Sequence, residues 1–354
     1  ALADAADRLG AHPFVGRHAE LAQLAASLRS CAAGGTGGTV LVRGDAGIGK
    51  SRLIGELRQQ ALAEGFVCHT GLVLDFGMAK GRDAIREIVV GLMGLPRGSD
   101  DEARREAFRQ LLTRHPSLSS DEPFLLDLLD LSRPADGDTL YAAMDNAARQ
   151  RGRAAAVVHL LATACADSPV LVIVEDVHWA DPLTLDYLAA LTRGAGTMSA
   201  VLALTSRVAG DPLDAAWRGS VHGSSFITID LGPLGTKDAL ALAGGFVSAP
   251  PAFARRCVER SGGNPLFLEQ LMRAADEGED GLPASLHSLV LARMDRLPER
   301  DRAALRAASV VGPRFPLALV RHLAQLPDYS CDVLVAHFLV RPEGEEFLFA
   351  HALI

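Results

Sequence analysis

The chain has 354 residues, 49% of them hydrophobic and 22% charged, which is typical of a soluble globular protein with more than one packed unit. No apolar run is long enough to span a bilayer and no signal-peptide pattern begins the chain, so we expect a cytoplasmic protein without a membrane partner. The net charge of -8 and the lack of a basic stripe argue against direct nucleic-acid binding by this segment.

The five cysteines are far apart and form no CxxC pair. This pattern supports neither a disulfide framework nor a zinc site, and it agrees with a reducing compartment. The chain starts without an initiator Met and stops without a helix stop signal, so we expect it to be part of a longer protein.

The first part of the chain predicts helices alternating with short strands. Residues 19–28 place apolar side chains at helical spacing, and a glycine-rich connector leads to TVLVR, residues 39–43. This short apolar run is rich in β-branched residues, which predicts a buried parallel strand. A helix over 51–65, which ends at Gly65, and a second strand over 66–74 are expected next.

The middle of the chain contains an irregular segment followed by three strong strands. Residues 77–137 show patches of helical pattern and loop signals, so we expect a mostly helical insertion. The apolar runs over 168–176, 199–207 and 224–232 predict strands with helices between them. Alternating strands and helices predict an α/β fold with a parallel sheet and crossover helices.

The last part of the chain has a different character, because the strands disappear at about residue 236. Residues 236–280 predict a small helical domain. Residues 281–354 contain further helices and then two extended runs around Gly344, which predicts a winged-helix domain. The expected domains are therefore 1–235, 236–280 and 281–354.

The stretch GDAGIGKS matches the phosphate-binding pattern G-x-x-x-x-G-K-[ST] between a strand and a helix. Glycines allow the backbone N–H groups to turn toward phosphates, and the helix N-terminus adds its positive dipole end. Lys50 is expected to reach the β- and γ-phosphates and Ser51 to bind Mg²⁺. A chance match is a poor explanation in a chain with only three lysines. The residues expected to bind nucleotide here are Gly44, Gly47, Ile48, Gly49, Lys50, Ser51 and Arg52.

Two acids follow the most apolar strand of the chain. A phosphate-binding loop needs an acid at the end of a neighbouring strand to hold its metal. Glu175 is expected to face Mg²⁺, and Asp176 is expected to orient or deprotonate a water molecule. The alternative is a capped junction between strand and turn, where acids are common.

Three further side chains near this strand have open interpretations. His178 is able to carry a proton, but packing on Trp179 explains it at least as well. Asp181 precedes a proline, and a helix N-cap is a sufficient role for it. Arg207 follows a core strand, so it is either a sensor of the γ-phosphate or a surface arginine.

Together these motifs resemble a known class of proteins. FVGR at 14–17, GDAGIGKSRL at 44–53, VEDVHWADP at 174–182, LTSR at 204–207 and GGNPLFLEQL at 262–271 resemble the signal-transducing ATPases with numerous domains, the STAND class of P-loop proteins. The chain is most similar to the ATPase modules fused to class III adenylyl or guanylyl cyclases and to large LuxR-type regulators.

The resemblance implies an N-terminal arm and P-loop core over 1–235, a helical lid over 236–280 and a winged helix over 281–354. It also implies that Pro265 presses on the adenine base from the lid, although Pro265 is equally explained as a helix initiator. The residues implied on the adenine and ribose side are Phe14, Val15, Gly16 and Arg17.

A last implied contact is His351. In plant disease-resistance proteins and NOD-like receptors, a Met-His-Asp stretch of the winged helix touches bound ADP. This chain keeps the histidine but has Ala350 and Ala352 at the flanking positions. His351 therefore either donates to a diphosphate or is an ordinary histidine at a helix start.

The function implied is a switch that binds ATP or ADP with Mg²⁺ and hydrolyses ATP slowly, using Lys50, Asp176 and Arg207. Its partners would be covalently attached sensor and output domains, such as a nucleotide cyclase, and a second copy of the chain in the ATP state. The alternatives are the ATPase module of a LuxR-type transcriptional regulator and a conventional ATPase that performs work. DNA binding by the winged helix is disfavoured, since acids alternate with its arginines.

Overall fold

The computed structural model describes residues 14–73, 82–95, 100–131, 138–246, 250–276, 297–312, 314–337, 339–344 and 346–349, with 285, 290–291 and 294–295. The chain divides into two compact units. One consists of Arg17–Ala46 and Lys50–Leu231, and we call it the core unit. The other consists of Ala1–Gly16, Gly47–Gly49 and Gly232–Ile354, and we call it the second unit.

The core unit is built on a parallel sheet. Its strands are β1 (Gly38–Gly44), β2 (Val67–Leu72), β3 (Val170–Glu175), β4 (Ala200–Ser206) and β5 (Phe226–Leu231), in the spatial order β2-β3-β4-β1-β5. All of the pairings between them are parallel. The predicted α/β fold with a parallel sheet is confirmed.

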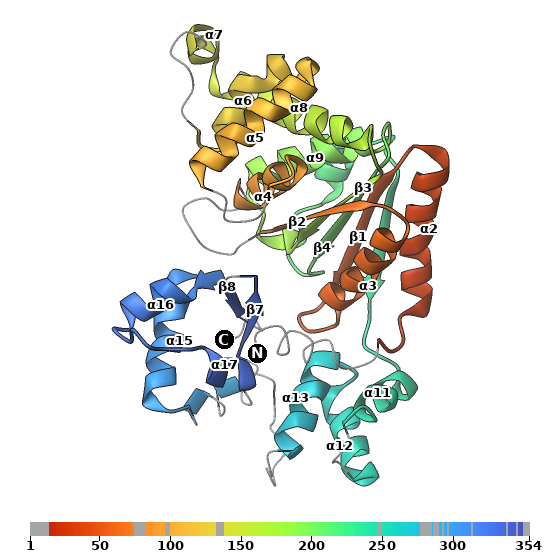
Figure 1. Ribbon diagram of the computed structural model, residues 1–354. Helices are drawn as coiled ribbons and strands as arrows, with labels where there is room; N and C mark the ends of the chain where they lie inside the picture. The colour runs from red at the N-terminus through yellow and green to blue at the C-terminus, as the bar shows by residue number, and fades with distance from the viewer. Residues whose placement is uncertain are drawn as a thin grey trace. The chain divides into compact units, whose positions relative to one another are not determined.

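Helices cover the sheet on both faces, which explains why its central strands β3 and β4 are buried along almost their whole length and are mostly apolar. On one face lie α2 (His18–Gly34) and α3 (Lys50–Ala63), and on the other lie α8 (Asn146–Cys165) and α9 (Pro182–Ala195) (Figure 1). Every residue of β4 is buried. The side chains of the sheet, α4, α8 and α9 form one large hydrophobic core.

The segment between β2 and α8 is mostly helical in the part that the structure describes. It forms α4 (Arg82–Leu92), α5 (Asp101–Arg114), the 3-10 helix η1 (Pro116–Asp121), α6 (Glu122–Leu128) and α7 (Asp138–Ala143). Leucines and a phenylalanine of these helices join the core of the sheet. A short helix, α10 (Ala215–Ser220), lies between β4 and β5.

The strand order determines which predicted site residues lie near one another. Parallel strands present their carboxyl ends at one edge of the sheet, and ligands of such sheets bind outside that edge. Because β4 lies between β1 and β3, the residue after β4 falls between the loop after β1 and the acids after β3.

After β5, the second unit contains a three-helix cluster. It comprises α11 (Thr236–Ala243), α12 (Pro251–Ser261) and α13 (Pro265–Asp276). Their apolar sides form a small core of their own. This cluster corresponds to the predicted helical lid, whose role and boundaries stay predictions.

The end of the second unit has helices and an antiparallel sheet. The helices are α15 (Glu299–Val311), α16 (Leu317–Leu323) and α17 (Asp332–Ala336). The strands β6 (Arg314–Pro316), β7 (Val340–Glu343) and β8 (Glu346–Phe349) pair in the order β6-β8-β7. Phe315 is fully buried and packs against Phe347. The two extended runs predicted around Gly344 form a hairpin, as a winged helix requires. Its assignment as a winged-helix domain stays a prediction.

No helix within the described ranges has the length and apolar character that a membrane span needs.

Candidate nucleotide site

The loop between β1 and α3 has the backbone of a phosphate cradle. Gly47 and Gly49 have φ values of 75° and 100°, in the left-handed region that only glycine adopts without strain. Lys50 opens α3, and its Nζ donates to the carbonyl oxygens of Gly44 at 2.8 Å and Asp45 at 3.1 Å. The lysine is thereby held over its own loop, 9% exposed, with its ammonium in place for an anion.

The metal-binding pair of the sequence prediction lies together. Ser51 in the first turn of α3 donates its Oγ–H to Glu175 Oε2 at the end of β3, at 2.5 Å. A hydroxyl and a carboxylate are hard oxygen ligands, and Mg²⁺ is usually held by one or two such groups with waters and phosphates. The donor set therefore fits Mg²⁺. No cluster of three or more His, Cys, Asp or Glu that could hold a metal occurs among the described residues.

Asp176 has an unusual backbone. Its φ of 58° and ψ of 42° place it in the left-handed region, which costs about 1–3 kcal/mol for a residue other than glycine. Asp tolerates this region better than most residues, and its N–H donates to Thr205 Oγ1 of β4 at 3.0 Å. The fold thus turns the chain sharply after β3 and pins the turn to the neighbouring strand.

Charges around the loop affect each other. Burial lowers the pKa of Lys50, an effect that Asp176, Asp45 and Glu175 oppose. Burial and then Glu175 raise the pKa of Asp176 above the usual carboxyl value, against Lys50 and Arg207. A carboxylate with a raised pKa is a better proton acceptor, which suits the role predicted for Asp176.

Arg207 follows β4 and stacks on an indole. Its guanidinium carbon lies 5.4 Å from the centre of the Trp179 ring, and the two residues come from loops after adjacent strands. Cation–π contact of this kind holds an arginine without neutralising it. The interpretation of Arg207 as a γ-phosphate sensor stays a prediction, but its position beside Lys50 and Asp176 is compatible with it.

His178 packs against Trp179, with ring centres 4.8 Å apart. Its side chain is only 4% exposed, and its Nδ1 lies 3.8 Å from Asp176 Oδ1. Burial, followed by Arg207 and Lys50, lowers the pKa of His178 to about 4, so the ring is neutral at pH 7. The packing interpretation is thus observed, and it leaves the ring beside the predicted catalytic acid.

A charge network under the loop was missed in the sequence analysis. Arg43 at the end of β1 binds Asp230 of β5 through two hydrogen bonds of 2.7 and 2.9 Å, and it donates to Asp211 at 3.1 Å. Asp211 also accepts from the hydroxyl of Ser206 and the N–H of Leu213. Arg43 and Asp230 are direct neighbours in the strand register. Opposite charges at the ends of two predicted strands were the available signal.

The residues predicted for the adenine side form the start of the described chain. Gly16 and Arg17 both have positive φ, at 62° and 58°, and the guanidinium of Arg17 pairs with Glu20 at 3.1 Å. Val15 packs against the three-helix core of the second unit. Phe14 precedes it. Arg52 pairs with Glu56 along α3 at 2.9 Å, the ordinary spacing of a surface ion pair.

Pro265 is the first residue of α13, and Asn264 caps that helix by accepting from the N–H of Phe267 at 3.1 Å. Its helix-initiating role is therefore observed. Inside the second unit, the N–H of Leu266 donates to the carbonyl oxygen of Gly47 at 3.2 Å. His351 lies outside the described residues.

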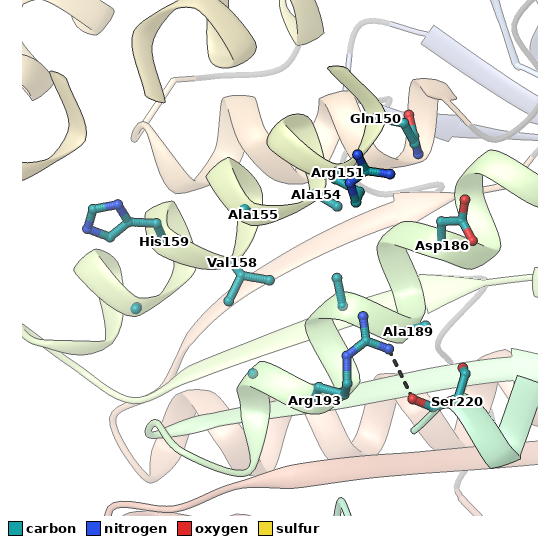
Figure 2. Close-up of a pocket in the computed structure, with 13 residues that line it drawn as sticks. Gln150, Arg151, Ala154, Ala155, Val158, His159, Asp186, Ala189, Arg193 and Ser220 are labelled. Atoms are coloured by element: carbon teal, nitrogen blue, oxygen red, sulfur yellow. Dashed lines mark hydrogen bonds between the residues drawn. The ribbon is translucent and has the colours of Figure 1, made fainter. Parts of the chain in front are cut away.

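A surface groove of about 810 Å³ lies between α8 and α9 of the core unit (Figure 2). Small side chains such as Ala154, Ala155 and Ala189 form its floor, and Arg193 at its edge donates to the carbonyl oxygen of Ser220 at 3.1 Å. No residue of the phosphate loop and neither acid after β3 lines this groove. It is therefore separate from the candidate nucleotide site.

Comparison with known proteins identifies the class. The family described as the AAA ATPase domain matches residues 13–204, which is more than half of the chain. The chain therefore belongs to the AAA ATPase domain family.

Three individual proteins are also similar to the chain. A crystal structure of a STAND protein with a tetratricopeptide repeat sensor, from Pyrococcus horikoshii, is similar with a TM-score of 0.56 and 16% identity, over 96% of this chain and 42% of that one. An uncharacterised protein of Rhizobium meliloti (strain 1021) is 28% identical over 90% of this chain and 33% of its own length. Cdc6p of Pyrobaculum aerophilum gives a TM-score of 0.47 at 12% identity, over 96% of this chain and 92% of that one.

The family match confirms the predicted AAA-type P-loop ATPase domain, and the solved STAND protein shares its fold. The chain spans about a third of the curated relative and less than half of the solved STAND protein.

Proposed function

We propose that the chain is the nucleotide-binding switch of a larger cytoplasmic signalling protein, binding ATP or ADP with Mg²⁺ and hydrolysing ATP slowly. The observation that carries the proposal is the contact between Ser51 and Glu175, with Lys50 on the same loop. It supplies, from α3 and β3, the hydroxyl and the carboxylate that a metal–phosphate complex needs.

Each residue of the candidate site has a separate role in the proposed reaction. The backbone N–H groups of Gly47 to Lys50 and the Lys50 ammonium would hold the β- and γ-phosphates. Mg²⁺, held by Ser51 and through water by Glu175, would neutralise phosphate charge. Asp176 would orient the attacking water and accept its proton. Arg207, held on Trp179, would sense the terminal phosphate from the end of β4.

A switch is favoured over a motor by the modules that follow the core. Nucleotide biases a two-state protein only through contacts that differ between the states. We expect ADP to hold a closed form through Pro265 and His351, and ATP to favour an open form that self-associates. The attached output domain would be a nucleotide cyclase or another effector. The relatives' extra length is compatible with such domains.

The first experiment is to purify the chain, denature it and identify the released nucleotide by mass spectrometry. Stoichiometric ADP or ATP is expected, and Lys50→Ala should release none. A protein that neither retains nor takes up adenine nucleotide with Mg²⁺ would refute the proposal.

The second experiment separates a switch from an engine. Asp176→Asn should abolish turnover while nucleotide binding and output of the full-length protein persist or become constitutive. If all output disappears with hydrolysis, the conventional ATPase is the better description. Should the full-length protein respond to ATP by binding DNA instead, the LuxR-type alternative gains.

A further inference from the structure

His178 has buried polar atoms that the packing role leaves unexplained. Its side chain is 4% exposed, and neither ring nitrogen has a hydrogen-bond partner among the residues that the structure describes. A buried donor or acceptor without a partner costs about 1–3 kcal/mol. Such groups are rare in native proteins, and each calls for a functional or structural reason.

The carboxylate of Asp176 lies beside this ring, and among the described residues it lacks a hydrogen-bond donor as the ring lacks a partner. The Asp176 carboxylate lies 3.8 Å from His178 Nδ1 and accepts no hydrogen bond from any described residue, although its backbone N–H is held by Thr205. The main chain of Asp176 is therefore fixed while its carboxylate is not. Contacts at catalytic sites are often long without ligand and shorten when the substrate is bound.

The surroundings of the ring keep it neutral. Burial, and then Arg207 and Lys50, lower the pKa of the ring, and Asp211 is too weak an opposing charge to reverse this. Trp179 packs against the imidazole of His178, and the guanidinium of Arg207 lies over the indole of Trp179. A neutral imidazole has one N–H donor, and Nδ1 is the nitrogen beside the carboxylate.

We propose that His178 is a positioning residue for hydrolysis: its Nδ1–H donates to Asp176 in the nucleotide-bound protein and aims the carboxylate at the attacking water. This inference rests on the ATPase activity proposed above. Asp176 remains the group that accepts the proton, and His178 acts only through it.

Two substitutions separate donation from packing. His178→Phe keeps a planar ring against Trp179 but removes the donor, whereas His178→Asn restores an N–H near the Nδ1 position. We expect His178→Phe to lower kcat roughly 10- to 100-fold with the KM for ATP and the ADP affinity within twofold of native, since a small misplacement costs this much. His178→Asn should recover most of the loss.

The matched control is His159→Phe. His159 lies on α8, and its Nδ1 is 2.6 Å from Asp121 Oδ2 of η1. Neither residue belongs to the phosphate loop, so the substitution should leave kcat unchanged. If His178→Phe turns over like the native protein, or if His178→Asn is as slow as His178→Phe, the proposal is overturned. Absence of turnover in the native protein would instead refute the proposed activity.

A second readout does not depend on turnover. In the full chain loaded with Mg²⁺–ADP, ¹⁵N NMR of the eleven histidine side chains distinguishes the two neutral tautomers, and the signal lost in His178→Phe assigns the ring. The Nδ1–H tautomer is expected, with a shift that changes in Asp176→Asn. An Nε2–H tautomer would overturn the proposal even if ATP is hydrolysed.

Discussion

At the scale of single residues, Asp211 connects the segments next to the candidate site through its hydrogen bonds. Its carboxylate, on a side chain only 8% exposed, accepts from Arg43, from the Ser206 hydroxyl and from the N–H of Leu213. It thus links the end of β1 to the loop that carries Arg207. Removing one partner of a buried charged network leaves the others unsatisfied.

We therefore expect Asp211→Ala to lower the free energy of unfolding of the core unit by about 2 kcal/mol. Asp211→Asn, which keeps an acceptor oxygen, should cost less. Urea denaturation followed by tryptophan fluorescence measures both, since Trp179 and Trp217 are the only tryptophans and both lie in the core unit. Equal midpoints for the native protein and Asp211→Ala would contradict the role assigned to this network.

His178 predicts a pH dependence of stability. Its pKa of about 4 in the folded protein is below the unfolded value of about 6.5, so the unfolded chain binds the extra proton between these values. Stability therefore falls as the pH drops from about 6.5 to 4, by at most about 3.5 kcal/mol at 1.4 kcal/mol per pKa unit. His178→Phe should remove this part of the slope in denaturation curves measured across that range.

The comparison of the native protein with His178→Phe makes the pH test specific. Carboxyl groups titrate in the same range and affect all variants alike. Only the difference between native and His178→Phe curves reports His178, and a difference that is constant with pH would show that the ring titrates normally.

The site residues that could be predicted are those that belong to a contiguous sequence motif; contacts between distant segments could not be predicted. Lys50, Ser51, Glu175 and Asp176 stand in contiguous motifs after predicted strands, and the structure places them together. The Arg43–Asp230 pair depends on β1 and β5 being neighbours, which no local pattern reveals. Asp211 and Thr205 were missed for the same reason.

At the scale of elements, the position of a helix end was predictable where a single local interaction determines it. Asp181 caps α9 by accepting from the N–H of Thr184 at 2.7 Å, as its place before Pro182 predicted. The five strands lie within or close to the predicted runs, and the agreement has a clear reason for β3 and β4, because buried parallel strands are mostly apolar. The strand order was not predictable, since it is decided by packing of distant segments.

Two helical glycines predict opposite outcomes for the same substitution. On α8, a methyl group at Gly152 would lie 2.1 Å from the Phe124 ring of α6, whereas one at Gly55 on α3 meets nothing within 4 Å. Gly55→Ala should therefore stabilise the protein by about 0.5–1 kcal/mol through helix propensity. Gly152→Ala should destabilise it by about 1–3 kcal/mol through overpacking.

The two substitutions are compared by thermal unfolding of otherwise identical chains. Phe124→Leu combined with Gly152→Ala should recover part of the loss, because the smaller side chain leaves room for the methyl group. Destabilisation by both alanines, or by neither, would show that the close approach of α6 and α8 does not decide the effect.

At the scale of the whole molecule, the two compact units provide a test of the switch. A ligand stabilises only the part of a protein that binds it, by about 2.7 kcal/mol at a free concentration of one hundred times Kd. A chain with two units need not unfold in one step, so each unit can be followed separately. Tryptophan fluorescence reports the core unit alone, and circular dichroism reports the helices of both units.

If ADP contacts both units, as the proposed closed form requires, Mg²⁺–ADP should raise the urea midpoint in both signals. If ATP favours an open form, as we propose, a non-hydrolysable ATP analogue should raise the fluorescence midpoint and leave the remaining circular-dichroism transition near its ligand-free position. Lys50→Ala should remove every shift, because it takes away the phosphate-binding ammonium. An ADP effect confined to fluorescence would mean that the core unit binds nucleotide by itself, and the switch would then need a different physical basis.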